Sequence, residues 1–178
     1  SDVFINNAQV SVADIDVDNG VVHVIDAVLV PGETVVDVVV ASPDHTTLET
    51  AVVASELAPA LTDPFASFTL FAPTDAAFAN LPTGVLDALL ADPTGALADV
   101  LLYHTIDSEV FSGDLSNGLI ATTINGDDVI VTISGSDVFI NNAQVSVADI
   151  DVDNGVVHVI DAVLVPGETV VDLSLIHI

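Results

Sequence analysis

The spacing of apolar positions changes near Ile106, and this change divides the chain into two kinds of predicted element. Between Ser42 and this point, apolar side chains mostly recur every three or four residues, as on the buried face of a helix. After it, they alternate with polar residues or form short runs between turns that contain Asn and Gly, as in strands. Helices followed by antiparallel strands predict an α+β domain and not a parallel α/β sheet.

The first predicted helix lies within Ser42–Leu61. Thr46 and Glu49 have the spacing of a capping box, in which the two residues bond reciprocally at the start of a helix. Leu48 and Val52 then fall on one helical stripe, which we expect to face the core.

A buried strand and three more helices are predicted downstream. The apolar run Phe68–Ala72 is typical of a buried strand and ends at a proline. Thr74 is placed to cap a short helix after it. Two longer helical runs follow, within Thr83–Pro93 and Thr94–Ile106, and each begins with Thr-Gly.

The second half of the chain reads as a series of hairpins. Leu119–Ile133 has apolar runs on both sides of Asn125–Gly126, a dipeptide that strongly favours a tight hairpin turn. Further turns are predicted at Asn141–Asn142 and Asn154–Gly155.

A long stretch of this strand region occurs twice. Ser1–Asp37 returns unchanged as Ser136–Asp172, at an offset of 136 − 1 = 135 residues. Identity over such a length indicates a recently copied tandem repeat or an engineered one.

Charge excludes several classes of partner. The 178 residues include 27 Asp and Glu and no Lys or Arg. Nucleic acids need cationic side chains to displace phosphate counterions, and anionic membranes repel such a chain. Self-repulsion is relieved by salt or divalent cations, so we expect a saline, calcium-containing medium. The alternative interpretation is an acidic surface that only maintains solubility.

Two further absences narrow the chemistry. The chain has no cysteine, which excludes disulfides, zinc–thiolate sites and a thiol nucleophile. Its longest apolar runs are far shorter than the roughly 18 residues that a membrane span requires, so no membrane insertion is expected.

Three motifs, in order, resemble the fasciclin domain family: "TLFAPTDAAFANLP" at Thr69–Pro82, "LLYHTI" at Leu101–Ile106 and "NGVVHVIDAVLVP" at Asn154–Pro166. The resemblance implies antiparallel β-sheets packed as a wedge or sandwich with several short helices. It also implies a secreted or cell-surface location, contacts with cell-surface or matrix proteins or carbohydrates, and no required cofactor.

The duplication then predicts the domain organisation. Residues 1–33 resemble the closing strands of a preceding fasciclin-like repeat, and residues 34–172 form one complete domain plus a linker. The tail at residues 173–178, "LSLIHI", breaks the repeat and is interpreted as non-native. Identical modules can pack head to tail on neighbouring copies of themselves, which predicts a filament or matrix.

The family's "YH" pair is found at Tyr103 and His104. The resemblance makes this pair a candidate adhesion region. The alternative is structural, with both side chains packed inward at the end of a helix. His158, within "VHVID", has the same structural alternative. A metal shared by His104 and His158 would need a third ligand.

A candidate calcium site is "DIDVDNG", because calcium prefers oxygen ligands and this segment has acidic residues at alternate positions. The candidate ligands are Asp149, Asp151 and Asp153, with equivalents Asp14, Asp16 and Asp18 in the first copy. The segment departs from an EF-hand loop, whose glycine lies one position earlier and which ends in Glu. The alternative is a strand whose acidic side chains share one solvent face.

No catalytic motif is found. The chain has no nucleophile elbow, P-loop or dinucleotide-binding glycine pattern. Ser112, Ser116 and Ser134 lie in turn-like surroundings without a His–Asp partnership. The sequence therefore predicts an extracellular structural or adhesive protein and no enzyme. The alternative is a calcium-assisted binding module for a carbohydrate or protein on a cell surface.

Overall fold

The structure, a computed structural model, describes residues 2–5, 8–29 and 32–166. It divides into two compact units, Ser1–Gly32 and Glu33–Ile178, and each is described here by itself. The predicted non-native tail at residues 173–178 lies outside the described residues, as does the end of the predicted domain at residues 167–172.

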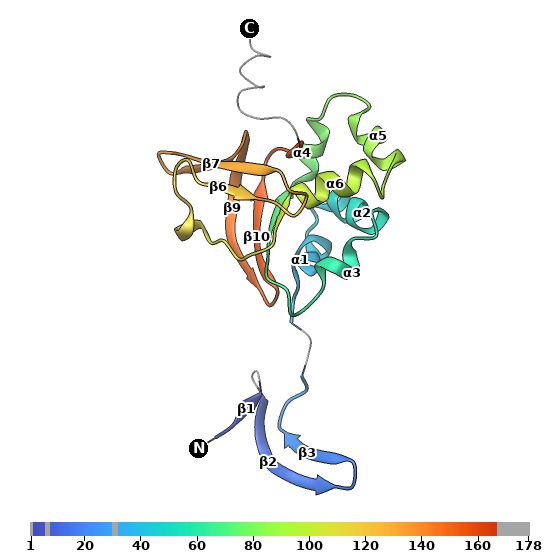
Figure 1. The fold of residues 1–178 in the computed structure, drawn as a ribbon, viewed down its shortest axis with the longest axis vertical. Helices are drawn as coiled ribbons and strands as arrows, with labels where there is room; N and C mark the ends of the chain where they lie inside the picture. Colours follow the sequence, from blue (N-terminus) through green and yellow to red (C-terminus); the bar gives the residue numbers. More distant parts are fainter. Residues whose placement is uncertain (1, 6–7, 30–31, 167–178) are drawn as a thin grey trace. The chain divides into compact units, whose positions relative to one another are not determined.

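The larger unit contains six α-helices within its described residues, and they gather on one side of its sheet (Figure 1). They are α1 (Val35–Ala41), α2 (Thr46–Ala54), α3 (Ala58–Leu61), α4 (Asp75–Ala79), α5 (Val85–Ala91) and α6 (Ala96–Tyr103). A short 3-10 turn follows at Ser112–Asp114. The helices predicted around Leu48, after Thr74 and in the two Thr-Gly runs are confirmed, although the first segment forms two helices, α2 and α3.

Seven strands form one sheet in the order β5-β4-β10-β9-β8-β7-β6. Their bounds are β4 (Phe68–Pro73), β5 (Thr105–Ile106), β6 (Ile120–Thr122), β7 (Asp128–Ser134), β8 (Asp137–Ile140), β9 (Ala143–Val152) and β10 (Gly155–Ile160). In Figure 1, β6 and β7 run across the direction of β9 and β10, so the sheet bends strongly.

The α+β class is confirmed, with one departure from the predicted antiparallel pattern. β10 pairs with β4 in parallel, with Gly155 opposite Phe68 and Ile160 opposite Pro73. The other pairings in this sheet are antiparallel. A parallel pair requires a long crossover, and here the helices α4–α6 and the hairpins lie between the two strands in the sequence.

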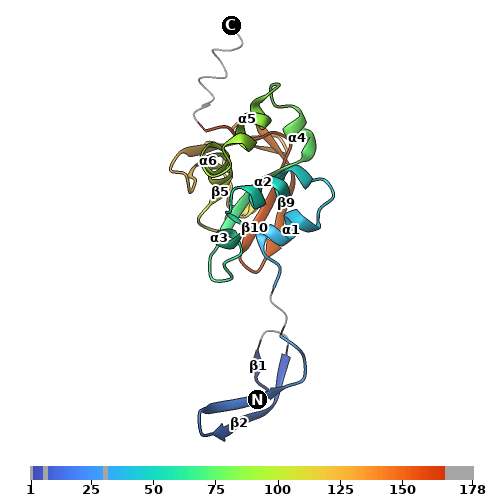
Figure 2. The ribbon, with the colours of Figure 1, turned by 90° about the vertical axis from the view of Figure 1, so that its right-hand side faces the viewer.

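The parallel pair β4 and β10 is buried on both faces and separates two hydrophobic cores. Leu70 and Ala72 of β4 face the core beneath the helices, and Figure 2 shows α1, α2 and α3 in front of β9 and β10. Phe71, between them in the sequence, faces the second core beneath the hairpins. Alternate side chains of one strand therefore serve opposite cores, as the twofold repeat of a strand requires.

Helix α1 is not among the predicted elements, because its sequence is rich in valine, which favours strands. Its start is fixed by a capping box: the Thr34 hydroxyl accepts from the backbone N–H of Asp37, and the Asp37 carboxylate accepts from that of Thr34. The Thr34 hydroxyl also donates to the Asp37 carboxylate at 2.7 Å, and this bond, followed by that from the Thr34 backbone N–H, lowers the pKa of Asp37. Burial of Val35, Val36 and Val39 in the helical core completes its stabilisation.

The capping box predicted at Thr46 and Glu49 is wrong. His45 is the N-cap residue of α2, and its side chain makes no capping bond. Instead Asp75, at the start of α4, reaches across to α2 and accepts from the backbone N–H groups of Thr46 at 3.3 Å and Thr47 at 2.7 Å. The bonds from Thr47 and Thr46 lower the pKa of Asp75 to about 2.

Replacing Asp75 with alanine is expected to lower the free energy of unfolding by about 1–2 kcal/mol, the usual cost of losing a helix cap. The change leaves the first amides of α2 without an acceptor and unties α2 from α4. Urea denaturation of this variant and of Asp44→Asn, a nearby exposed control, measures the effect. Equal midpoints for the two variants would show that Asp75 does not cap α2.

The smaller unit is a three-stranded antiparallel sheet in the order β1-β2-β3, with bounds β1 (Phe4–Ile5), β2 (Ala8–Val17) and β3 (Gly20–Ile25). Its pairing matches that of β8–β10 at an offset of 135 residues. Val10 pairs with Ile25, as Val145 does with Ile160, and the other pairs and register shifts follow the same rule. Identical sequence has therefore produced identical local hairpins.

Candidate functional site

The Tyr103–His104 pair lies at the end of α6, and both side chains are buried. His104 Nδ1 lies 2.7 Å from the Val100 carbonyl oxygen, and its Nε2 accepts from the backbone N–H of Leu164 at 2.9 Å. The ring must therefore be neutral, with the proton on Nδ1. Burial lowers the pKa of His104 to about 4, against an opposing contribution from the Val100 carbonyl.

Tyr103 joins α6 to the hairpins. Its hydroxyl donates to the Asp128 carbonyl at 2.9 Å and accepts from the Asn141 side-chain amide at 3.0 Å. Burial raises the pKa of Tyr103. Both side chains of the candidate adhesion region thus lie inside the module, where they hold the exit of α6, the hairpins and the chain after β10 together. Because both side chains are buried, a partner would contact the surface residues around this pair and not the pair itself. Adhesion at this region stays a prediction.

His158 also has a structural position. Its Nε2 lies 2.8 Å from the Val110 carbonyl oxygen, and its Nδ1 accepts from the backbone N–H of Asp149 at 3.3 Å. The ring stacks on Phe71 with centroids 5.9 Å apart. His158 therefore ties β10 to the bulge in β9 and to the loop before the 3-10 turn. His104 and His158 are not joined by a third ligand among the described residues.

Among the candidate calcium ligands, Asp149 is already bonded within the module. Asp149 has a positive φ of 59° in the β9 bulge, and its carboxylate accepts from the backbone N–H and the hydroxyl of Ser112. These bonds, led by that from the Ser112 side chain, lower the pKa of Asp149. Within residues 2–5, 8–29 and 32–166, no three His, Asp or Glu side chains lie close enough together to hold a metal ion.

Calcium binding at Asp149, Asp151 and Asp153, and at their equivalents in the first unit, stays a prediction. Calorimetry with Ca²⁺ on the chain and on its Asp151→Ala, Asp153→Ala variant tests it. Saturable binding lost in the variant supports a specific site, whereas a non-saturable response indicates screening of the net charge.

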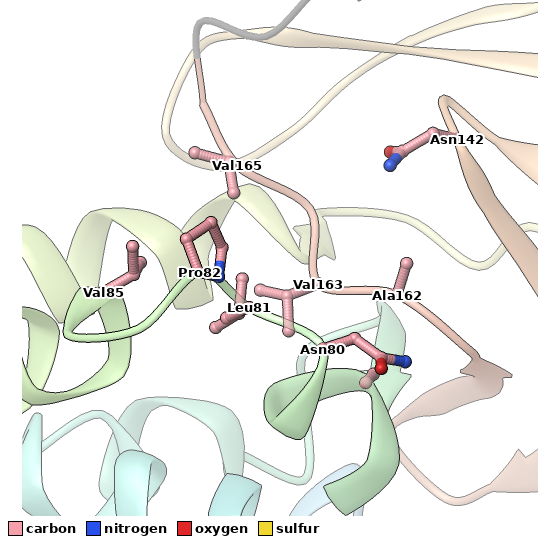
Figure 3. Close-up of a pocket in the computed structure, with 9 residues that line it drawn as sticks. Asn80, Leu81, Pro82, Val85, Asn142, Ala162, Val163 and Val165 are labelled. Atoms are coloured by element: carbon pink, nitrogen blue, oxygen red, sulfur yellow. The ribbon is translucent and has the colours of Figure 1, made fainter.

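A pocket of about 370 Å³ opens where the chain leaves β10 (Figure 3). Val163 and Val165 form one side, and Leu81 and Pro82 of the α4–α5 connection, with Val85 at the start of α5, form the other. Ala77, Asn80, Asn142 and Ala162 complete the lining.

The pocket has room for a ligand group but has no side chain for acid–base or nucleophilic chemistry. Its lining has no titratable or hydroxyl side chain, and its polar groups are the amides of Asn80 and Asn142. An apolar side chain of a partner, with one or two hydrogen bonds to these amides, suits such a lining.

Asn154 is the residue that sequence reasoning underestimated, since its Asn-Gly context indicates only a turn. Its side chain is fully buried. The amide oxygen accepts from the backbone N–H of Val35 at 2.9 Å, and the amide nitrogen donates to the carbonyls of Leu61 at 2.8 Å and Asp63 at 3.2 Å. One side chain thus joins the β9–β10 turn to the start of α1 and the end of α3. An amide supplies a donor and an acceptor together, and no sequence signal identified its partners.

Comparisons with known proteins identify the family of this chain. Residues 1–31 and 43–166 match the profile of the fasciclin domain family. The chain belongs to this family, as the "YH" and "TLFAPTDAAF" motifs indicated.

Relatives include human periostin, 35% identical over 160 residues, which cover 88% of this chain and 19% of periostin. Protein sll1735 of Synechocystis is 37% identical over 134 residues, or 75% of this chain and 98% of that protein. The periostin match covers more of the chain than Glu33–Ile178 could supply alone, so it extends into the first unit.

Among solved structures, a FAS1 domain pair from the insect cell adhesion molecule Fasciclin I matches with a TM-score of 0.65 and 27% identity. The match covers 89% of this chain and 60% of that one. It bears out the predicted fold of several short helices against β-sheets. No helix in the described part of the chain is long and apolar enough to cross a bilayer.

Proposed function

We propose that this chain is part of an extracellular adhesive or structural protein built from tandem fasciclin domains, which contacts neighbouring copies of itself and cell-surface or matrix partners. Support comes from the family and from the cell adhesion molecule among its solved relatives. The chain spans 19% of periostin's length, so what periostin does as a whole protein is not assigned to this chain.

The duplicated hairpin is the observation that carries the tandem arrangement. Residues 1–31 match the family separately from residues 43–166, and β1–β3 have the register of β8–β10. In a tandem protein, Ser1–Gly32 would be the closing strands of the module before Glu33. Its exposed apolar side chains would then be buried, as their equivalents are in the complete module.

The ends of the complete module also suit a head-to-tail array. At its start, the Glu33 carbonyl accepts from the backbone N–H of Asp153, just before β10. Past the other end of β10, the backbone N–H of Leu164 donates to His104. Figure 1 shows α1 and α4 at opposite ends of this strand. A chain that starts at one end and leaves at the other extends the array with each module instead of folding it back.

Adding a second copy of Glu33–Gly135 in front of Ser1 tests the arrangement. The added segment supplies what the first hairpin lacks, so we expect two complete modules and a large fall in the fluorescence of a bound hydrophobic dye, per chain. Asn19→Ala together with Gly20→Ala in this longer chain is the matched control, because the equivalent Asn154 is fully buried and a Cβ at the equivalent Gly155 would collide with the Phe68 carbonyl. Dye binding that the added segment leaves unchanged would refute the arrangement.

Adhesion is tested on the same longer chain. Surfaces coated with it are expected to retain cells above the level of a coating of equal negative charge without fasciclin domains. Electron microscopy of longer arrays distinguishes regular fibres, which the proposal expects, from separate beads on a flexible string, which would contradict constant contacts between modules.

A further inference from the structure

The complete module has an apolar pocket at one end and an exposed aromatic side chain at the other. The pocket is the one of about 370 Å³ between the α4–α5 connection and the chain after β10. The aromatic side chain is Phe65, in the loop between α3 and β4, and it is 96% exposed. No other large apolar side chain among residues 32–166 is as exposed.

Buried contacts hold two sides of the pocket in place. The backbone N–H of Leu164 donates to the buried His104 ring at 2.9 Å, and the residues on both sides of Leu164 line the pocket. The Asn141 side chain donates to the Tyr103 hydroxyl at 3.0 Å, and the residue after Asn141 lines the pocket as well. The Tyr103–His104 pair therefore shapes the pocket from inside the module, so a ligand group enters between walls that are already formed.

The size and lining of the pocket select one large apolar side chain. Its volume is near the lower end of the roughly 300–1,000 Å³ usual for ligand pockets. The lining has no charged group, and its polar side chains are the amides of Asn80 and Asn142. Because the chain contains no Lys or Arg, such amides are the kind of side chain that can donate hydrogen bonds to a carboxylate of a second acidic chain.

The loop that carries Phe65 is fixed by hydrogen bonds, and we call residues 63–66 the Phe65 turn. The Asp63 carboxylate accepts from the backbone N–H of Phe65 at 3.0 Å. The Asp63 carbonyl accepts from the backbone N–H of Ala66 at 3.3 Å and from the buried Asn154 amide at 3.2 Å. Pro64 restricts the backbone between them. A ring presented in this way loses little conformational freedom on binding and gains the burial of nearly its whole surface.

We propose that the Phe65 turn of one copy of the chain binds in this pocket of a second copy. The ring packs against the apolar lining, and the Asn80 and Asn142 amides donate to the Asp63 carboxylate at the edge of the pocket. The inference rests on the proposed function, because it names the surfaces by which neighbouring copies contact each other. Both surfaces lie within residues 63–165, so the first unit takes no part in the contact.

A module cannot fill its own pocket with its own Phe65. The Phe65 turn is bonded to Asn154, directly before β10, whereas Ala162 and Val163 of the pocket follow the end of β10. The six residues of β10 place these ends about 20 Å apart. Figure 1 likewise shows α3 and α4 at opposite ends of this strand. The contact is therefore heterologous, and repeating it joins copies head to tail in a row.

The charge of the chain opposes this contact and gives it a recognisable dependence on salt. Each copy has a net charge of −27, so two copies repel each other. Salt screens the repulsion but leaves the burial of an apolar ring intact. We therefore expect association to strengthen as the salt concentration rises, which is opposite to the behaviour of a contact made by ion pairs.

Nuclear magnetic resonance of the pocket methyl groups measures the contact on the chain as it is. The signals of Leu81, Val85 and Val163 should shift with protein concentration at high salt. Phe65→Ala should weaken the association about tenfold, the usual order of effect for an aromatic anchor. Val53→Ala is the matched control, because Val53 is 66% exposed on α2, away from both surfaces, and its loss should leave the response unchanged.

A mixture of two variants tests whether the ring and the pocket come from different copies. Phe65→Ala keeps the pocket without the ring, and Ala162→Leu keeps the ring but fills the pocket. Neither should associate alone, but unlabelled Ala162→Leu should shift the pocket signals of isotope-labelled Phe65→Ala. The unlabelled double variant should not shift them. Circular dichroism checks that each variant is folded; if Ala162→Leu is not, Asn142→Asp at an exposed position replaces it.

Three outcomes overturn the proposal. Pocket signals that do not change with concentration at high salt would show that no second copy binds there. A full response in Phe65→Ala, or a shift caused by the double variant, would show that another group fills the pocket. A response that weakens at high salt would indicate an ionic contact. The dye experiment on the longer chain does not involve this pocket, so failure of the tandem arrangement can be told apart.

Discussion

Replacing Asn154 with alanine is expected to lower the free energy of unfolding of the module by about 3 kcal/mol, because buried polar groups left without partners cost about 1–3 kcal/mol each. The loss affects the backbone N–H of Val35 and the carbonyls of Leu61 and Asp63 together. It would separate the β9–β10 turn from two helices, so one small side chain has an effect usually associated with a large core residue.

The duplicated sequence offers a matched control for this result. Asn19→Ala removes the same side chain from the same hairpin where it is exposed, and it should change stability by no more than about 0.5 kcal/mol, as for most surface substitutions. Urea denaturation of both variants gives the comparison. We expect the free energy of unfolding to depend equally steeply on urea concentration in the two variants, so that their midpoints can be compared directly. Asn154→Asp should be at least as harmful as alanine at neutral pH, because it buries a charge and loses the donor. Equal midpoints for Asn154→Ala and Asn19→Ala would contradict the role given to Asn154.

Acidification from pH 6.5 to about pH 4 is expected to reduce the stability of the module through His104. Burial lowers the pKa of His104 in the folded state to about 4, from 6.5 for an unperturbed imidazole. In this window the unfolded chain binds a proton that the folded chain does not, so stability is complete above pH 6.5 and falls as the pH falls. The shift corresponds to about 3 kcal/mol as an order of magnitude.

His104→Gln isolates this contribution, since an amide retains a donor and an acceptor but does not titrate in this range. The variant should be less stable than the wild type at pH 7 and have a flatter dependence on pH between 6.5 and 4. Asp37, Asp75 and Asp149 have lowered pKa values, so they add stability that is lost only as the pH falls below about 4. They act equally in both proteins. Parallel pH profiles would show that His104 does not govern the acid response.

Local sequence determined most of the elements and their register. The apolar spacing around Leu48 and the run Phe68–Ala72 predicted α2 and β4, and the dipeptides Asn125–Gly126 and Asn154–Gly155 predicted their turns. Each of these signals depends on neighbours within a few residues, so it can be read without the fold. The repeat shows this directly, since β2 and β3 have the same bounds as β9 and β10 at an offset of 135 residues, and the same bulge, at Asp14 and Asp149.

Tertiary structure alone decided which distant segments these elements contact. A valine-rich run became α1 because its side chains are buried beneath the sheet and Thr34 caps it, against its intrinsic preference for a strand. The cap of α2 came from Asp75, which no local motif connects to it.

Asn19 and Asn154 show most clearly the difference between what local sequence and what tertiary structure determines. The two have the same neighbours in sequence and the same turn, yet one is in solvent and the other is fully buried with three partners. Hydrogen bonding along the chain fixes a hairpin, but burial depends on surfaces supplied by distant segments. The sequence therefore determined the shape of the repeated hairpin, and only the presence of Glu33–Gly135 around one copy decided which of the two became part of a core.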